Sequence, residues 1–141
     1  MLDLIWFARY AYRFERAFRS DRWDAVRASF HPDATYEIAG SGTRYDGIVR
    51  GADAIVELFR HMLDEVDRRY DRRQPRLVGR PRVVGGEVCI DWSVKYSLGA
   101  DAAIITGTSR CALDRRRIRR LHDTMHADEC ARWVALVAPT G

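Results

Sequence analysis

The sequence predicts one α+β domain over residues 1–141, with helices packed on one face of a curved antiparallel β-sheet. In the first half of the chain, apolar residues recur every three or four positions, as on helices. In the second half they recur every second position, as on strands. The length is that of one domain, and a domain of about 150 residues buries roughly 68–70% of its unfolded surface. A sizeable core therefore needs no metal or disulfide.

Two helices are expected at the start of the chain. Residues 2–19 carry one apolar stripe at helical spacing. A short helix is expected over 22–30, capped by Ser20 or Asp21, because short polar side chains accept hydrogen bonds from free helical N–H groups. The sequence His31-Pro32-Asp33 ends it, since proline lacks the N–H that the next helical turn requires.

A strand at 34–39 follows, because its residues alternate and include β-branched and aromatic side chains. A loop punctuated by four glycines then contains a short extended piece. The apolar face after this loop predicts a third helix over 52–66. The charged segment 67–75 is expected to be the frayed end of that helix and a loop.

An antiparallel meander is predicted for the second half of the chain. Its expected strands are 76–84, 87–97, 102–113 and 117–126. Short turn sequences separate the last three, and Gly85-Gly86 separates the first two. A short terminal helix is expected over 127–137.

Composition favours a soluble, cytoplasmic protein with no metal site. The chain is 47% hydrophobic and 31% charged, which is usual for a globular protein. Its three cysteines, Cys89, Cys111 and Cys130, show neither a disulfide framework nor zinc-ligand spacing. No stretch reaches the ~20 apolar residues of a membrane span. Arg9 and Arg13 interrupt the apolar N-terminus, so a signal peptide and a membrane partner are not expected.

The net charge of +4, which comes almost entirely from arginine, raises the question of a nucleic-acid partner. The densest basic run, 114–120, spans an expected hairpin turn whose side chains are solvated. No aromatic residues interleave with this run, as stacking on single strands requires. Nucleic acid is therefore not expected to be a partner.

The order of elements and three sequence runs resemble SnoaL-like proteins of the nuclear-transport-factor-2-like (NTF2-like) superfamily. The runs are WDAVRASFHPDATYE, YDGIVRGADAIVELF and GTSRCALDRRRIRRLHDTM. The resemblance implies a cone-shaped sheet, wrapped by three helices from the N-terminal half, around one apolar pocket. It also implies a range of activities: isomerase, cyclase, dehydratase, epoxide hydrolase or non-catalytic adaptor.

Asp123 is the candidate catalytic residue. If Leu121 and Met125 face the core, Asp123 shares their inward face, because side chains alternate along a strand. Burial of an unpaired carboxylate raises its pKa above about 3.9, which suits a general base or acid. The resemblance implies the same position for the working aspartate of SnoaL-like cyclases and limonene-epoxide-hydrolase-like enzymes. The alternative is a structural ion pair with an arginine.

Tyr96 and Ser109 are expected to donate hydrogen bonds to a carbonyl or enolate oxygen of the substrate. No cofactor is expected, because proton transfer at an already acidic C–H needs only a tuned carboxylate. The pocket should hold a flat, apolar, cyclic small molecule, since such ligands stack on aromatic rings. The expected substrate-binding residues are Tyr10, Phe14, Tyr36, Ile38, Phe59, Met62, Trp92, Cys111, Leu121 and Met125.

Two mechanisms of similar folds are not expected. Phe14, Ile38 and Ser109 stand where ketosteroid isomerase has its oxyanion tyrosine, its base aspartate and its protonated acid. Trp92 and Val94 stand where the epoxide hydrolases have an arginine and a second aspartate. The losses at Phe14, Ile38 and Ser109 keep open the alternative to an enzyme, which is a non-catalytic ligand-binding or dimeric interaction module of the same fold. A homodimer is expected through the polar outer face of the sheet.

Overall fold

A computed structural model describes residues 2–139 of the chain. The helices are α1 (Leu2–Ser20), α2 (Asp24–Ala28), α3 (Ala52–Glu65), the short 3₁₀ helix η1 (Asp67–Arg69) and α4 (Ala127–Leu136). The strands are β1 (Phe30–Ala39), β2 (Gly47–Arg50), β3 (Arg72–Leu77), β4 (Arg82–Val84), β5 (Glu87–Leu98), β6 (Asp101–Asp114) and β7 (Arg117–Met125). The predicted α+β class is confirmed.

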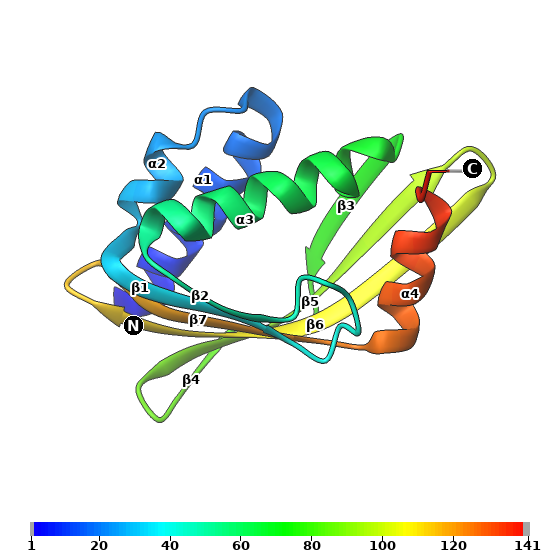
Figure 1. Ribbon diagram of the computed structural model, residues 1–141. Helices are drawn as coiled ribbons and strands as arrows, with labels where there is room; N and C mark the ends of the chain where they lie inside the picture. The colour runs from blue at the N-terminus through cyan, green and yellow to red at the C-terminus, as the bar shows by residue number, and fades with distance from the viewer. Residues whose placement is uncertain (1, 140–141) are drawn as a thin grey trace.

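These strands form one sheet in the order β2-β1-β7-β6-β5-β3, and β4 pairs with β5 beside this path. Every pair is antiparallel except β1 and β7, which run parallel with Ile38 opposite Asp123. Helices α1, α2 and α3 cover one face of the curved sheet, and α4 lies at its far end (Figure 1). The parallel pair brings the first strand of the chain beside the last, which matters for the site below.

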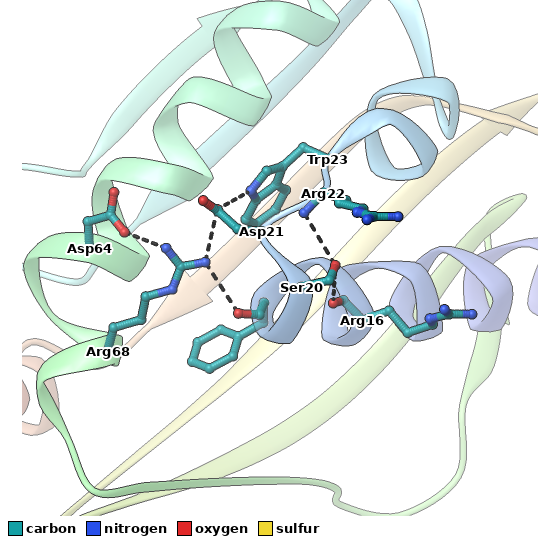
Figure 2. Close-up of polar contacts among 8 residues, drawn as sticks. Arg16, Ser20, Asp21, Arg22, Trp23, Asp64 and Arg68 are labelled. Carbon is teal, nitrogen blue, oxygen red and sulfur yellow. Dashed lines mark hydrogen bonds and ion pairs between the residues drawn. The ribbon is translucent and has the colours of Figure 1, made fainter.

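One of the two side chains predicted to cap α2, that of Asp21, instead binds Arg68 of η1 (Figure 2). Asp21 has a left-handed backbone with φ of 59° and accepts hydrogen bonds from Trp23 Nε1 at 2.9 Å and Arg68 Nη2 at 3.1 Å. Arg68 also donates to the carbonyl oxygen of Phe18. The cap prediction is therefore wrong: α2 has no side-chain cap, and the Ser20 hydroxyl bonds back into α1.

Strand β1 begins at Phe30, four residues earlier than predicted, so His31-Pro32-Asp33 lies inside a strand. Proline is tolerated there because the pairing of β1 with β7 is interrupted between Phe30 and Thr35. The backbone N–H that proline lacks is thus not required by the sheet.

The segment 67–75 was expected to be the frayed end of the third helix and a loop. Asp67–Arg69 form the 3₁₀ helix η1 directly after α3, but the expected loop is wrong. Residues from Arg72 form β3, an edge strand antiparallel to β5. Pro75 is tolerated because an edge strand leaves one side unpaired. The single strand predicted over 76–84 is instead divided by residues 78–81 into the end of β3 and β4.

The core fills the space between the helices and the inner face of the sheet. Phe59 of α3 lies at its centre, with ring centroids 5.1 Å from Phe14 and 5.1 Å from Tyr36. Its ring also contacts Phe30 at 6.1 Å and stacks on Trp23 at 6.4 Å. One residue therefore connects α1, β1 and the residue that precedes α2 to α3.

Candidate functional site

The helices and the inner face of the sheet enclose a cavity of about 670 Å³. Ligand sites commonly have volumes of about 300–1,000 Å³, so a drug-sized molecule fits this space. Most of the lining side chains are apolar. Two groups of polar residues lie among them, one around Asp123 and one around Asp67, and Arg80 also lines the cavity.

Asp123 lies near the end of β7 and turns its carboxylate into the cavity. The register places Ser109 of β6 directly opposite it, and the parallel pairing brings Tyr36 of β1 close on the other side. Asp123 Oδ1 accepts the Ser109 hydroxyl at 2.6 Å, and Oδ2 accepts the Tyr36 hydroxyl at 2.6 Å. Ser109 in turn accepts Trp92 Nε1 at 2.9 Å. Side chains from four strands thus fix the orientation of one carboxylate.

The surroundings of Asp123 shift its ionisation to higher pH. Burial raises its pKa above the ordinary value, and the hydrogen bonds from Ser109 and Tyr36 oppose this shift in part. Burial also raises the pKa of the Tyr36 hydroxyl well above its ordinary value, and the adjacent carboxylate adds to the effect. Tyr36 is therefore a neutral hydrogen-bond donor at neutral pH. Within residues 2–139, no arginine forms an ion pair with Asp123.

The second polar group was missed by the sequence reasoning. Asp67, at 7% exposure, follows α3, and its Oδ2 accepts the Tyr96 hydroxyl at 3.1 Å and lies 3.5 Å from Arg73 Nε. Arg73 Nη1 donates to both carboxylate oxygens of Glu15, at 2.8 and 2.6 Å. Burial raises the pKa of Asp67 to about 6, against the attraction of Arg73. No local signal marks these residues, because only the pairing of β3 with β5 brings Arg73 opposite Tyr96.

Most of the predicted site residues line this one cavity. They are Tyr10, Phe14, Tyr36, Phe59, Met62, Trp92, Tyr96, Ser109, Asp123 and Met125. Three others, Ile38, Cys111 and Leu121, face inward but are packed in the core and do not reach the cavity wall. Strand alternation predicts the face on which a side chain lies, but it does not predict whether neighbours cover it. The roles of all these residues in binding stay predictions.

Tyr96 lies elsewhere than the predicted role requires. Ile90 of β5 is the residue opposite Ser109, and Tyr96 follows it six positions further along the strand. Its hydroxyl is bonded to Asp67 rather than directed at Asp123. Ser109, by contrast, lies in direct contact with the candidate base.

A smaller hollow of about 420 Å³ lies between α1 and the β6–β7 turn. Its walls include Arg9, Arg13 and the arginines 115–117. Trp6 of α1 lies among them, with its ring centre 5.0 Å from the Arg116 guanidinium. The sequence reasoning against nucleic acid rested on the absence of such an aromatic residue, and the fold supplies one from a distant helix. The absence of a nucleic-acid partner stays a prediction.

In the part of the chain from 2 to 139, no group of three His, Cys, Asp or Glu side chains could hold a metal ion. No helix within the same residues is long and apolar enough to cross a membrane. Cys89, Cys111 and Cys130 are buried and unpaired, and burial raises the pKa of the Cys111 thiol. Cys111 is therefore a core residue and has no thiolate character.

A curved sheet closed by helices over an apolar cavity, with a carboxylate on its last strand, defines an NTF2-like domain, the fold of several solved structures. Within this class the chain belongs to the SnoaL-like domain family, whose model matches residues 11–118. No curated protein sequence matches the chain.

Three solved structures illustrate the range of this fold. A protein of Rhodopseudomonas palustris, named as a candidate isomerase, superposes with a TM-score of 0.74 at 12% identity, over 92% of this chain and 96% of that one. TerC, co-crystallized with polyporic acid, has a TM-score of 0.68 at 15% identity, over 89% and 95%. An epoxide hydrolase of M. tuberculosis superposes with a TM-score of 0.64 at 19% identity, over 90% of this chain and 83% of that one. At these identities the likeness shows the fold alone.

Gly107 of β6 lies under the Trp92 ring, and the close contact predicts a destabilising substitution. A Cβ at this position would come within 2.4 Å of Trp92 Cζ2 and 2.7 Å of the Thr124 carbonyl oxygen. Gly107→Ala should therefore cost about 1–3 kcal/mol of unfolding free energy, as overpacking does. It should also displace Trp92 from Ser109. Urea unfolding measures the cost, and Trp92→Phe in the same chain should relieve part of it. An unchanged urea midpoint would show that the contact is looser than described.

The raised pKa of Asp67 predicts that its contribution to stability is lost as the pH rises from about 4 to about 6. Its pKa is 3.8 in its ordinary state and about 6 in the folded protein. Across that interval the unfolded chain loses the proton while the folded protein keeps it, so the free energy of unfolding decreases as pH rises. The loss should be on the order of 2–3 kcal/mol. Asp67→Asn should lack this component, which is read as the difference in urea midpoints between variant and wild type at pH 4 and pH 7. A constant difference would contradict the raised pKa.

Proposed function

We propose that the protein is a cofactor-independent acid–base catalyst of the isomerase, cyclase or lyase type, acting on an apolar cyclic small molecule. The observation that carries this proposal is one carboxylate, Asp123, held by two hydroxyl donors in the wall of an apolar cavity of about 670 Å³. A buried carboxylate whose pKa is raised is a stronger base than one in water, which suits proton transfer.

In the proposed reaction, Asp123 takes a proton from a carbon next to a substrate carbonyl. The electron pair of the broken C–H bond moves to the carbonyl oxygen and forms an enolate. Once protonated, Asp123 attracts the Ser109 and Tyr36 hydroxyl groups less strongly, and either group can then donate to the enolate oxygen. Where a carbon–carbon double bond adjoins the enolate, its charge extends to the γ carbon, and return of the proton from Asp123 to that carbon completes an isomerisation without a cofactor.

The proposal gives Ser109 and Tyr36 the positioning of the base, and Trp92 the positioning of Ser109. It assigns Tyr96 no part in proton transfer, because the hydroxyl of Tyr96 is bonded to Asp67. Epoxide hydrolysis is not favoured, although a structural neighbour is named for it, since Trp92 and Val94 replace the residues that the resemblance requires. The name of another neighbour, a candidate isomerase, and the co-crystal of TerC with polyporic acid are consistent with a small cyclic ligand.

The first test uses 2-tetralone, a cyclic ketone whose benzylic hydrogens beside the carbonyl are acidic. The protein should accelerate their exchange with deuterium from heavy water, measured by proton NMR against buffer of the same pH. A carboxyl-carbon NMR titration, with Asp123→Asn for assignment, should show a pKa for Asp123 above about 3.9. Exchange no faster than in buffer, together with an ordinary pKa, would exclude the proposed chemistry.

A non-catalytic ligand-binding module is the second candidate. It is favoured by one observation: the Trp92, Ser109, Asp123 and Tyr36 side chains form a hydrogen-bond network that is complete without a ligand. This candidate predicts binding of cyclic ketones without exchange. A homodimer through the outer face of the sheet also remains a proposal, and sedimentation velocity tests it.

A further inference from the structure

Three polar atoms of residues that line the main cavity have no hydrogen-bond partner. They are Asp67 Oδ1, an acceptor, and two donors, Trp133 Nε1 and Arg73 Nε. Arg73 Nε lies 3.5 Å from Asp67 Oδ2 and is compensated by its charge, which leaves Asp67 Oδ1 and Trp133 Nε1 without any partner. Asp67 and Trp133 are enclosed by the protein, at 7% and 2% exposure. Buried polar groups are nearly always hydrogen-bonded, because an unmade bond leaves the cost of removing the group from water uncompensated. A missing donor and a missing acceptor in a ligand-sized cavity point to a ligand group that supplies both.

The two unpartnered atoms belong to one rigid cluster. The Tyr96 ring packs 5.0 Å from Tyr70 and 5.7 Å from Trp133, measured between ring centroids. The Tyr96 hydroxyl donates to Asp67, and the Tyr70 hydroxyl donates to the carbonyl oxygen of Trp133. Residues from β5, from η1 and the position after it, and from α4 therefore hold one another in place before any ligand arrives, which is the arrangement that specific recognition requires.

Charge selects the kind of ligand group. Arg73 binds Glu15 through both carboxylate oxygens, so these two charges largely compensate each other. The Asp67 carboxylate is left with a single contact to Arg73, at 3.5 Å, and repels anions. An ammonium group would satisfy Oδ1 but has no lone pair for an N–H donor, and it is costly to bring into an apolar cavity. A hydroxyl group both donates and accepts and carries no charge.

This cluster and Asp123 face the same cavity from different places. Tyr96 lies six residues along β5 from the position opposite Ser109, a distance of about 20 Å on an extended strand and less on a curved one. The Asp67 carboxylate still contributes to the raised pKa of Tyr36, so the two polar groups are within electrostatic reach across the cavity. A ligand that contacts both must be elongated.

We propose that Asp67, with Trp133 connected to it through Tyr96, forms a subsite that recognises a hydroxyl group at the far end of an elongated, otherwise apolar ligand. The hydroxyl donates to Asp67 Oδ1, while the carbon that loses its proton lies at Asp123. The second half of this statement rests on the function proposed above, and the recognition of the hydroxyl group does not. The substrate class is therefore a hydroxylated polycyclic or aryl-substituted cyclic ketone.

A matched pair of probes tests the subsite by calorimetry. The compound 4-(4-hydroxyphenyl)cyclohexanone carries a phenol at one end and a ketone at the other, and 4-phenylcyclohexanone lacks only the hydroxyl. Wild type should bind the phenol roughly tenfold more tightly or better, as expected for a hydrogen bond to a charged group. Asp67→Leu should abolish this preference while binding 4-phenylcyclohexanone as before. Equal affinity of the two compounds for wild type, or a preference that persists in folded Asp67→Leu, would overturn the proposal.

Two further variants keep the outcome decisive. Trp133→Phe removes one N–H and retains an apolar ring, so it should reduce the preference even if Asp67→Leu fails to fold, as judged by circular dichroism. Unchanged preference in Trp133→Phe would then count against the subsite. Asp123→Asn should keep the full preference, because it leaves the Asp67 cluster intact. If wild type does not accelerate deuterium exchange, only the proposed catalysis is refuted. If wild type binds the two compounds with equal affinity, only the subsite is refuted.

Discussion

Asp123→Asn is expected to slow protein-catalysed deuterium exchange of 2-tetralone by roughly 10²–10⁴-fold, the usual contribution of a general base. The amide has nearly the same shape as the carboxylate and keeps one oxygen that can accept from Ser109 or Tyr36. The affinity for 2-tetralone and the urea midpoint should therefore change little. Exchange rates by NMR and binding by calorimetry, on the same preparation, separate the two effects.

Tyr36→Phe provides the matched comparison for this substitution. It removes a hydrogen bond that lowers the pKa of Asp123, so that pKa should rise further and the pH at which exchange becomes half-maximal should move upward. Exchange at high pH should survive, because the base itself is still present. A shifted pH profile in Tyr36→Phe would identify Tyr36 as a positioning residue. Loss of exchange in Asp123→Asn would identify Asp123 as the base. An Asp123→Asn variant with the wild-type rate would end the enzyme hypothesis.

The parts of the fold that sequence patterns predicted well are those with a single strong period. The stripe over 2–19 became α1 almost residue for residue, and the alternation around Asp123 placed this residue on the inward face together with Leu121 and Met125. Local hydrophobic periodicity is sufficient for these elements, because the period alone shows which face of the helix or strand is buried. The candidate base is a residue of this kind.

The errors arise where distant segments decide the local structure. Arg72 and Arg73 were predicted to lie in a charged loop, but they form a strand because β5 pairs with them. Asp21 was predicted to cap a helix, but it binds Arg68, which lies far away in the sequence. The hydroxyl of Tyr96 had no predictable partner, because Asp67 lies in a segment with no apolar period. The second polar group of the cavity is a product of tertiary pairing, and no window of sequence contains it.

Phe59→Ala is expected to have the largest effect on stability, about 3–5 kcal/mol, the usual cost of truncating a buried phenylalanine. Phe59 is 4% exposed and packs against rings from α1, from β1 and from Trp23 just before α2, so no neighbour can collapse into the space without leaving its own contacts. Since small domains have a total stability of only about 5–15 kcal/mol, a large part of the margin would be lost. Urea unfolding followed by far-ultraviolet circular dichroism measures the change.

The same substitution also separates the roles of packing and chemistry at the site. Phe59 supports the Tyr36 ring, whose hydroxyl holds Asp123, so Phe59→Ala should loosen the base as well as destabilise the fold. Phe59→Leu, which retains most of the apolar volume, should cost markedly less and keep exchange activity. If the alanine variant lost little stability, the aromatic cluster would not be the centre of the core. If it lost stability but exchanged deuterium at the wild-type rate, the orientation of Asp123 would depend on the sheet alone, through Ser109.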